Sequence, residues 1–412
     1  MEPKYTVDSL PRTTGSHRRG PEPRGPRRRS HRRGAGPRGP RRPPRAGFRV
    51  RASALALLAA LGLTACPLSR APDESSLTVV SYNVQNLFDA RDDGTEYPEF
   101  DPEGGWTEER AREKAERVGE VIAASVRGGP DILCLQEIEN REALELLTRR
   151  ELGRLGYTDA AVTEAAGSAV QVGVLSRYPI EAVKTHAVRL GFGRTARAPT
   201  SDRTHPHSLR PVLEVTVSAG SEPLHLIVNH WKSKSEGAAE TEPARRAAAA
   251  VVARLIRSVQ TSDPEAQIIV CGDLNEGPHE FEASGGDYLT ALMPVGEPGP
   301  SELLYLTSDP ARVGTKEGRV VLFSPWSAAT APGSYTYRDE WRRIDHILLS
   351  RAFFDEEGVE FSGFRVARPA FAATNNGRPI GSRRAGEPGG GYSDHFPVVL
   401  TLRPVDARPR AQ

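Results

Sequence analysis

The sequence has few cysteines and no apolar run long enough for a membrane-spanning helix. Its 412 residues include three cysteines, Cys66, Cys134 and Cys271, and none belongs to a Cys/His spacing that suits zinc. The apolar run 54–63 is too short to span a bilayer as a helix. No internal repeat of roughly 20–50 residues is evident, which argues against a repeat architecture. The composition, 38% hydrophobic and 26% charged, is typical of a globular protein.

Charge is distributed unevenly along the chain. The whole sequence has a net charge of +2, but residues 1–50 contain 15 Lys and Arg against 3 Asp and Glu, a net of about +12. The remainder is therefore acidic, with a net of about −10. An acidic globular part does not suggest a protein that binds polyanions through bulk charge. A phosphate substrate would need local basic residues or bound cations.

The first 49 residues are expected to be disordered. Residues 11–47 are rich in Arg, Pro and Gly and have almost no apolar side chains, so they cannot bury enough surface to offset their chain entropy. One interpretation is a nucleic-acid-binding arm. The other, which we favour, is that this stretch is not part of the natural protein and that translation begins near Val50, because a signal sequence follows.

Residues 50–66 have the pattern of a lipoprotein signal peptide. A charged start leads into the apolar run 54–63, and the small-residue sequence LTAC ends at Cys66. We expect Cys66 to carry the lipid, residues 67–76 to form a tether and residues 405–412 a tail. The prediction is an exported protein anchored on the periplasmic or cell-surface side of a membrane, with secretion as the alternative.

Residues 77–404 alternate between strand and helix patterns, which predicts a layered α/β domain. Helices are expected after Thr107, after Asn140 and over 244–260. Apolar, β-branched runs predict strands at 77–80, 131–136, 170–176, 211–217, 224–228, 267–270, 344–349 and 396–402. Residues 276–335 are interrupted by Gly and Pro and give no clear pattern. Cys134 and Cys271 lie in apolar strands and are interpreted as buried free thiols.

Polar residues stand at the ends of several expected strands. Because side chains alternate between the faces of a strand, each of four polar residues shares a face with apolar residues that precede it: Asn83, Glu137, His230 and Asp273. If these faces point to one core, the polar groups meet at its rim. Carboxylates brought together repel one another and need a cation, and oxygen-rich sites suit Mg²⁺ or Mn²⁺.

Six motifs in order resemble the endonuclease/exonuclease/phosphatase superfamily, which includes DNase I-like nucleases, abasic-site endonucleases and bacterial sphingomyelinases. They are SYNVQNLFD (81–89), LQE (135–137), NHWKS (229–233), GDLN (272–275), RIDHI (343–347) and SDHFP (393–397). Each motif alone is weak, but their common order is specific. The resemblance implies a four-layer α-β-β-α sandwich of two mostly antiparallel sheets, with the active site at one edge.

The resemblance also implies roles for individual residues. A metal, Mg²⁺ or Mn²⁺ with Ca²⁺ as an alternative, would be held by Asn83, Glu137 and Asp394. An in-line displacement at phosphorus would be assisted by five further side chains: His230, Asp273, Asn275, Asp345 and His395. Asp345 would orient His395. Arg210 and Lys232 are interpreted as binding phosphate oxygens.

Several other polar residues leave alternatives open. The acidic residues Asp92, Asp93, Glu96, Glu99, Asp101 and Glu103 form a calcium loop or a solvated loop, and we favour the solvated loop. His205 and His207 could hold a metal or lie in a solvated loop, and we favour the solvated loop; His346 is expected to be structural. Basic residues near the motifs could recruit a nucleic acid: Lys232, Lys234, Arg245, Arg246, Arg342 and Arg343.

The leading functional hypothesis is a phosphodiesterase that acts on extracellular nucleic acid. The rival is a phospholipid or sphingomyelin phosphodiesterase, or another phosphatase, for which residues 321–326 (VLFSPW) are a candidate lipid-inserting hairpin. A third hypothesis is a surface binding module without catalysis. No protein partner is predicted.

Overall fold

The computed structural model describes residues 76–149, 152–165, 167–190, 209–220, 222–382 and 391–405. The expected N-terminal segment, the signal peptide with Cys66, nearly all of the tether, and residues 406–412 lie outside the described residues. So do His205 and His207. The predictions made for them stay predictions.

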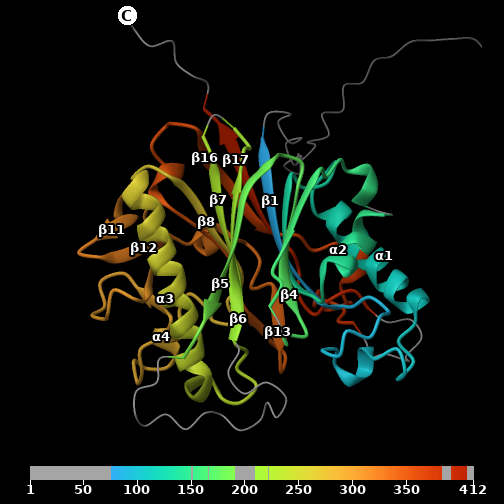
Figure 1. Ribbon diagram of the computed structural model, residues 1–412. Coiled ribbons are helices and arrows are strands. Elements are labelled where there is room, and N and C mark those ends of the chain that lie inside the picture. The colour runs from blue at the N-terminus through green and yellow to red at the C-terminus, as the bar shows by residue number, and fades with distance from the viewer. Residues whose placement is uncertain are drawn as a thin grey trace, which may run out of the picture. The chain divides into compact units, whose positions relative to one another are not determined.

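Two β-sheets lie face to face, and helices cover their outer faces (Figure 1). The first sheet has six strands in the order β16-β17-β1-β2-β4-β3, and only β1 and β2 run parallel. Its strands are β1 (Leu77–Leu87), β2 (Ile132–Ile138), β3 (Asp159–Val162), β4 (Gln171–Ser176), β16 (Val359–Val366) and β17 (Val398–Pro404).

The second sheet has nine strands in the order β5-β6-β7-β8-β15-β12-β10-β9, with β11 paired to β12. Its strands are β5 (Ile180–Val188), β6 (Leu209–Val217), β7 (Leu224–His230), β8 (Gln267–Asp273), β9 (Leu292–Pro294), β10 (Leu304–Thr307), β11 (Gly314–Lys316), β12 (Arg319–Phe323) and β15 (Asp345–Leu349). A separate hairpin pairs β13 (Tyr335–Tyr337) with β14 (Glu340–Arg342). The predicted sandwich of two mostly antiparallel sheets is confirmed.

Alternating side chains divide the apolar residues among three main cores. The inner faces of the sheets meet in a core to which Val79, Leu226 and Ile269 contribute. The outer face of the first sheet is covered by α1 (Glu108–Ser125) and α2 (Arg141–Thr148). The outer face of the second sheet is covered by α3 (Ala238–Ser262). Burial of these faces is the main favourable contribution to the fold.

The helices begin largely where their capping residues predict. The Thr107 hydroxyl accepts a hydrogen bond from the amide of Arg110 (3.3 Å), and the Asn140 carboxamide accepts one from Ala143 (2.8 Å). Helix α3 begins earlier than expected, at Ala238. The buried Arg245 guanidinium explains this extension, because it donates to the Ala238 carbonyl (2.6 Å) and so stabilises the first turn.

The stretch without a clear sequence pattern forms short elements. Besides the strands β9 to β13, it contains the short helix α4 (Glu280–Ala283). Single turns of 3₁₀ helix occur at Pro98–Phe100, Leu152–Arg154, Pro310–Arg312, Pro325–Ala328, Arg351–Phe353 and Ala370–Ala372. Within the part of the chain that the structure describes, no helix is long and apolar enough to cross a membrane.

Gly272 fixes the close approach of β7 and β8 immediately before Asp273. Its φ of +129° is unfavourable for residues with a side chain, and a Cβ atom there would lie 1.9 Å from the carbonyl oxygen of Asn229. Only glycine therefore allows the backbone path that leads into Asp273.

Candidate functional site

The polar ends of strands from both sheets converge at one edge of the sandwich. In the second sheet, Asp273 on β8 is paired in register with His230 on β7 and with Asp345 on β15. Asn83 on β1 faces these residues from the first sheet. The sequence motifs therefore lie side by side in space, although they are spread over more than three hundred residues.

Asn83 connects the two sheets. Its side-chain nitrogen donates to Glu137 Oε1 and to Asp273 Oδ2, both at 3.0 Å, and its side-chain oxygen accepts from the amide of Gln85 at 3.0 Å. The side chain is buried, so all of its hydrogen bonds are made within the protein. Asn83 thereby fixes the spacing of the two carboxylates on either side of the sheet interface.

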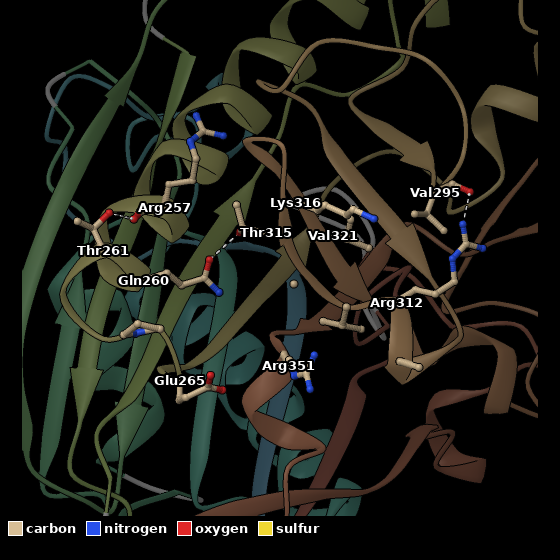
Figure 2. Close-up of a pocket in the computed structure, with 14 residues that line it drawn as sticks. Arg257, Gln260, Thr261, Glu265, Val295, Arg312, Thr315, Lys316, Val321 and Arg351 are labelled. Atoms are coloured by element: carbon tan, nitrogen blue, oxygen red, sulfur yellow. Dashed lines mark hydrogen bonds between the residues drawn. The ribbon is translucent and has the colours of Figure 1, made fainter.

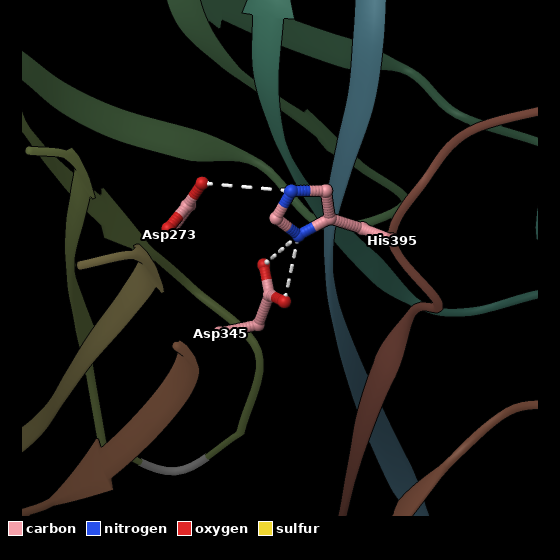
Figure 3. Close-up of side chains that lie close together, drawn as sticks. All are labelled: Asp273, Asp345 and His395. Carbon is pink, nitrogen blue, oxygen red and sulfur yellow. Dashed lines mark hydrogen bonds and ion pairs between the residues drawn. The ribbon is translucent and has the colours of Figure 1, made fainter. Parts of the chain in front are cut away.

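His395 is held by Asp345 (Figure 3). Its Nδ1 lies 2.8 Å from Asp345 Oδ2 and 3.1 Å from Oδ1, while Nε2 points to Asp273 Oδ2 at 3.8 Å. Its imidazole ring also stacks on Tyr335, with ring centroids 4.5 Å apart. Burial by itself lowers the pKa of His395, but the Asp345 carboxylate, followed by Asp394 and Asp273, raises it to about 10. The ring is therefore an imidazolium at neutral pH, with Nε2 facing the cluster.

His230 has the opposite electrostatic character. Its Nε2 lies 3.6 Å from Glu137 Oε1 and 3.8 Å from Asp273 Oδ2. Burial, together with the positive charges of Arg210 and His395, lowers its pKa well below the usual value. His230 is therefore neutral at pH 7. Its Nδ1 is buried and has no hydrogen-bond partner, so no hydrogen bond on that side of the ring fixes its orientation.

The carboxylates of the site crowd one another. Burial raises the pKa of Asp273 to about 7, the His395 charge opposes that rise and the Asp345 charge adds to it. Burial also raises the pKa of Asp394, and the nearby Glu137 charge contributes in the same direction. Groups that resist ionisation in this way are stabilised by a cation.

The donor set fits a hard divalent cation. Three ligand atoms, one each from Asp273, Asp345 and His395, lie within 4.8 Å of one another. Two of these residues, however, already bind each other, and an ion there would displace that pair. Glu137 and Asp394 have side chains that are 19% and 36% exposed, so solvent and substrate can reach them. Glu137 and Asp394 are therefore the accessible oxygen donors, and the buried Asn83 lies beside Glu137.

Strained backbone is concentrated at the site. Among the described residues, eight that are not glycine have positive φ, and four of them, Gln85, Asn86, Glu137 and Asn275, belong to the cluster. Such conformations persist where the surrounding structure enforces them, often at functional sites. The backbone amide of Asn275 donates to Asp273 Oδ1 (2.8 Å), and its side-chain nitrogen donates to the Trp231 carbonyl (3.1 Å).

The position of Glu137 in the cluster does not follow from the alternation of side chains along β2. Leu133 and Leu135 were expected to share its face, but they point outward to α1 and α2, whereas Cys134 points to the core between the sheets. The φ of 63° at Glu137 breaks the alternation. Its Oε2 then accepts from the amide of Asn86 (3.1 Å). The expectation that all the polar residues would follow a single core face was therefore wrong for this strand.

Gln85 is a site residue that motif reasoning missed. Its side-chain Oε1 accepts hydrogen bonds from the backbone amides of Ser382 and Asp394, the latter at 3.1 Å. This clamps the segment that carries Asp394 and His395 onto β1. The signal in the sequence was its place inside the SYNVQNLFD motif.

Lys114 is the second missed residue. It is buried on α1, and its ammonium group donates to the Tyr392 carbonyl (2.6 Å) and to the Ser382 hydroxyl. Burial lowers its pKa to about 7, while the charges of Asp394 and Glu137 act in the opposite direction. A lysine three residues after Ala111, on the apolar stripe of the expected helix, was the signal that could have found it.

The predicted phosphate-binding residues are only partly available. Arg210 lies next to the cluster, but it donates to the Trp231 carbonyl at 2.9 Å. Lys232 pairs with Glu236 at 2.8 Å, and Lys234 pairs with Glu280. Arg342 pairs with Glu340. Local acidic partners therefore offset much of the basic charge expected to recruit a nucleic acid.

Arg245 also has a different role from the one expected. It is completely buried and binds Glu242 (2.6 Å) and Glu276 (3.2 Å). Glu242 and Glu276 in turn accept from the amides of Ala291 and Leu292. Arg245 is thus part of an internal network that ties α3 to the loop after β8, and it is not accessible to substrate.

Three further expectations can be compared with the structure. The residues 321–326 form parts of β12 and a 3₁₀ turn, and Phe323 and Trp326 are buried, so this segment is not a lipid-inserting hairpin. His346 is buried and bonds the Glu276 carbonyl (2.8 Å), as expected for a structural histidine. Cys134 and Cys271 are buried free thiols, also as expected.

A separate cavity of about 860 Å³ is lined by residues of α3 and β11, among others (Figure 2). Its lining includes Glu265, which precedes β8, and Arg351, which follows β15, whereas Asp273 and Asp345 stand at the other ends of these strands. Three further basic residues line it: Arg257, Arg312 and Lys316. The polar cluster is therefore not part of this cavity.

Comparisons with known proteins find similar solved structures and one matching family model. Solved structures similar to this chain include truncated TDP2 from Caenorhabditis elegans (TM-score 0.45, 15% identity, covering 80% of this chain and 97% of that one). An endonuclease/exonuclease/phosphatase family protein from Bacteroides thetaiotaomicron has a TM-score of 0.46 and 16% identity, covering 81% and 99% of the two chains. Sphingomyelinase C from Streptomyces griseocarneus has a TM-score of 0.45 and 18% identity, covering 79% and 99%.

No curated protein sequence matches the chain. A sequence model of the Endonuclease/Exonuclease/phosphatase family, in contrast, matches residues 78–293, more than half of its length. That match includes the motifs that contribute Asn83, Glu137, His230 and Asp273 to the site. The chain therefore belongs to the endonuclease/exonuclease/phosphatase family of phosphoesterases.

Proposed function

We propose that this protein is a Mg²⁺- or Mn²⁺-dependent phosphodiesterase whose substrate is a nucleic acid. The observation that carries the proposal is the junction of both sheets at Asn83, where Glu137 and Asp273 meet one amide group at 3.0 Å each. Asn83, Glu137 and Asp394 would hold the metal. When bound, the metal would neutralise negative charge that develops on the phosphate.

The remaining residues have geometries that suit in-line displacement at phosphorus. The imidazolium of His395 faces the site through Nε2 and would donate a hydrogen bond to a phosphoryl oxygen. Asp273, oriented by the amide of Asn275, would position the attacking water and accept its proton. Neutral His230 would donate a hydrogen bond to the leaving oxygen as the P–O bond breaks. Arg210 and Lys232 would approach the outer phosphate oxygens.

Exposed aromatic residues near the cluster support a nucleic acid as the substrate. Tyr337, 49% exposed, stands on the hairpin whose Tyr335 stacks on His395. Phe371, 46% exposed, contacts Tyr392 next to the SDHFP motif. Such side chains form platforms on which bases stack, with gains of about 1–3 kcal/mol per base.

Guanidinium groups accompany these aromatic residues. Arg338 lies 5.2 Å from the Tyr337 ring, and Arg368 lies over Trp341. Arg378 pairs with Asp339 and so connects the hairpin to the segment that follows Phe371. Arginine next to aromatic rings is typical of surfaces that bind single strands.

The proposal is tested with purified protein and three substrates: a single-stranded oligonucleotide, bis-p-nitrophenyl phosphate and sphingomyelin vesicles. We expect Mg²⁺-dependent cleavage of the oligonucleotide and of the small diester, with loss of both in EDTA. Tyr337→Ala should weaken oligonucleotide cleavage and leave cleavage of the small diester unchanged. Cleavage of sphingomyelin without cleavage of the oligonucleotide would refute the assignment of substrate.

A lipid substrate is the second candidate, because exposed Tyr337 and Phe371 would also suit contact with a bilayer. In that case Tyr337→Ala would reduce vesicle hydrolysis and spare the oligonucleotide. We further propose export and membrane anchoring through Cys66, on the strength of the sequence pattern in residues 50–66. Metabolic labelling with palmitate, compared between wild type and Cys66→Ser, tests the anchor.

A further inference from the structure

A second group of acidic side chains lies behind Glu137 and is not used by the proposed reaction. Asp93 and Glu96 come from the loop after β1, and Glu139 follows the end of β2. One ligand oxygen from each of the three lies within 4.8 Å of the others. This acidic cluster, Asp93, Glu96 and Glu139, is distinct from the residues that hold His395.

The Glu139 carboxylate is the unusual member of the acidic cluster. The residue is only 4% exposed. Its Oε2 accepts from the amide of Asp89 at 2.7 Å, but its buried Oε1 has no hydrogen-bond partner. A buried carboxyl oxygen without a hydrogen-bond donor is costly, since neither water nor a donor replaces its lost hydration.

No side-chain cation compensates the acidic cluster. Among the residues that the structure describes, none of the three carboxylates forms an ion pair with Lys, Arg or His. The neighbouring Asp89 carboxylate adds a fourth negative charge and is also buried. Asn140 is the polar neighbour that bridges it to the cluster, donating to Asp89 Oδ2 at 3.2 Å and Asp93 Oδ2 at 3.1 Å.

The loop that carries the acidic cluster is anchored by aromatic packing. Phe88 and Phe100 stack with centroids 4.4 Å apart, and Trp106 packs edge-on against Phe100 at 4.9 Å. All three are buried, and the Trp106 indole donates to the Asp89 carbonyl at 2.6 Å. Asp92, Asp93 and Glu103 in the expected acidic loop are exposed, whereas Asp89, which precedes the loop, is buried. Because this aromatic packing anchors the loop, the three carboxylates stay close together before an ion binds.

We propose that Asp93, Glu96 and Glu139 bind a Ca²⁺ ion at a site separate from the catalytic metal. Carboxylate oxygens from a loop suit Ca²⁺, which accepts six to eight oxygen ligands in flexible geometry, whereas Mg²⁺ demands a near-ideal octahedron. Asp93 is exposed, so water can complete the coordination. The Oε1 atom of Glu139 gains the positive partner that it lacks.

The position of the ion links it to the active site. Glu139 donates its backbone amide to the Leu87 carbonyl (2.9 Å) and accepts the Asp89 amide on its side chain, so it fastens the ends of β1 and β2 together. Glu137, two residues earlier on β2, accepts a hydrogen bond from the Asn86 amide of β1 on its side-chain Oε2, so it lies at the same junction of the two strands. Bound Ca²⁺ therefore stiffens the backbone that orients Glu137 without taking part in the reaction.

Terbium provides a direct probe, because Tb³⁺ occupies oxygen-rich Ca²⁺ sites and Trp106, whose indole donates to the carbonyl of Asp89 beside the cluster, can serve as the sensitiser of its emission. We expect Tb³⁺ emission from the full-length wild type, and competition by Ca²⁺. Glu139→Gln should weaken Tb³⁺ binding at least about tenfold. Glu103→Gln, a change of an exposed carboxylate in the same loop, should bind like wild type. Glu137→Gln should also retain the emission, which separates this ion from the catalytic metal.

Thermal unfolding provides the second measurement. Ca²⁺ at about one hundred times its dissociation constant should raise the Tm of wild type and of Glu103→Gln by about 3 °C or more, and should not raise that of Glu139→Gln. In EDTA, Glu139→Gln should be at least as stable as wild type. Two outcomes would overturn the proposal: unchanged Tb³⁺ binding by Glu139→Gln, or a lower Tm of Glu139→Gln than of the wild type in EDTA. Loss of emission in Glu137→Gln alone would assign the ion to the catalytic site.

Discussion

Replacing Asp345 with Asn tests the electrostatic role of the residue that holds His395. Asp345 is 1% exposed, and its carboxylate makes contacts of 2.8 and 3.1 Å with His395 Nδ1 and accepts the Ser334 hydroxyl at 2.5 Å. Asparagine keeps the size and one acceptor but removes the charge. The change therefore alters the partner of His395 with little effect on packing.

The expected loss follows from the strength of a charged hydrogen bond. Such a bond contributes about 1.5–3 kcal/mol, and each ~1.4 kcal/mol corresponds to a factor of ten. We expect kcat/KM for bis-p-nitrophenyl phosphate at saturating Mg²⁺ to fall about 10- to 150-fold, mostly through kcat. Without the carboxylate, burial dominates and the pKa of His395 falls from about 10, so the alkaline limb of the pH profile moves to lower pH.

The assay needs a control for folding. Asp287→Asn, an exposed substitution in the loop before β9, should leave kcat/KM and the pH profile unchanged. Asp345→Asn should remain folded, with a cooperative melting transition. A loss of less than about threefold, or a large loss with no movement of the alkaline limb, would show that Asp345 does not act through the charge of His395.

Three further outcomes are expected. Glu137→Gln should raise the Mg²⁺ concentration for half-maximal activity about tenfold or more, and an unchanged Mg²⁺ titration would remove Glu137 from the metal site. His346 is buried with its pKa lowered by burial to about 4, so the unfolded chain binds the proton more readily; stability should fall by roughly 3 kcal/mol as pH drops from 6.5 to 4. The fall in urea midpoint over this pH range should be smaller for His346→Gln than for the wild type, and the buried His230 should account for part of what remains. Arg245→Met leaves Glu242 and Glu276 buried without their cation and should cost roughly 3–5 kcal/mol by urea unfolding, whereas a neutral result would contradict the buried network.

Much of the fold could be predicted because its determinants are local. Thr107 and Asn140 mark helix starts through side-chain caps, and the buried strands are continuous apolar runs. The edge strand β5 was missed, since most of its residues face solvent and it carries no apolar run. The short strands between residues 276 and 335 depend on tertiary pairing, which local pattern does not encode.

In the site, too, some residues could be placed from local pattern, whereas others depend on tertiary structure. The strand ends that carry His230 and Asp273 follow from alternation, because neighbouring strands bring register partners together. Glu137 could not be placed in this way, as its positive φ is imposed by the surrounding structure and not by its residue type. The buried environment of Lys114 depends on the docking of residues 382 and 392, distant in sequence, and so did not follow from helix periodicity.

The division of the site between two sheets has a consequence for how the protein loses activity. Glu137 and Asp394 belong to one sheet and its flanking segments, while His230 and Asp273 belong to the other, and apolar packing alone fills most of the space between them. A sliding of one layer by about 1 Å can lower turnover about a hundredfold while every strand stays paired. On heating, turnover should therefore fall before the circular dichroism signal changes, because turnover depends on the alignment of the two sheets.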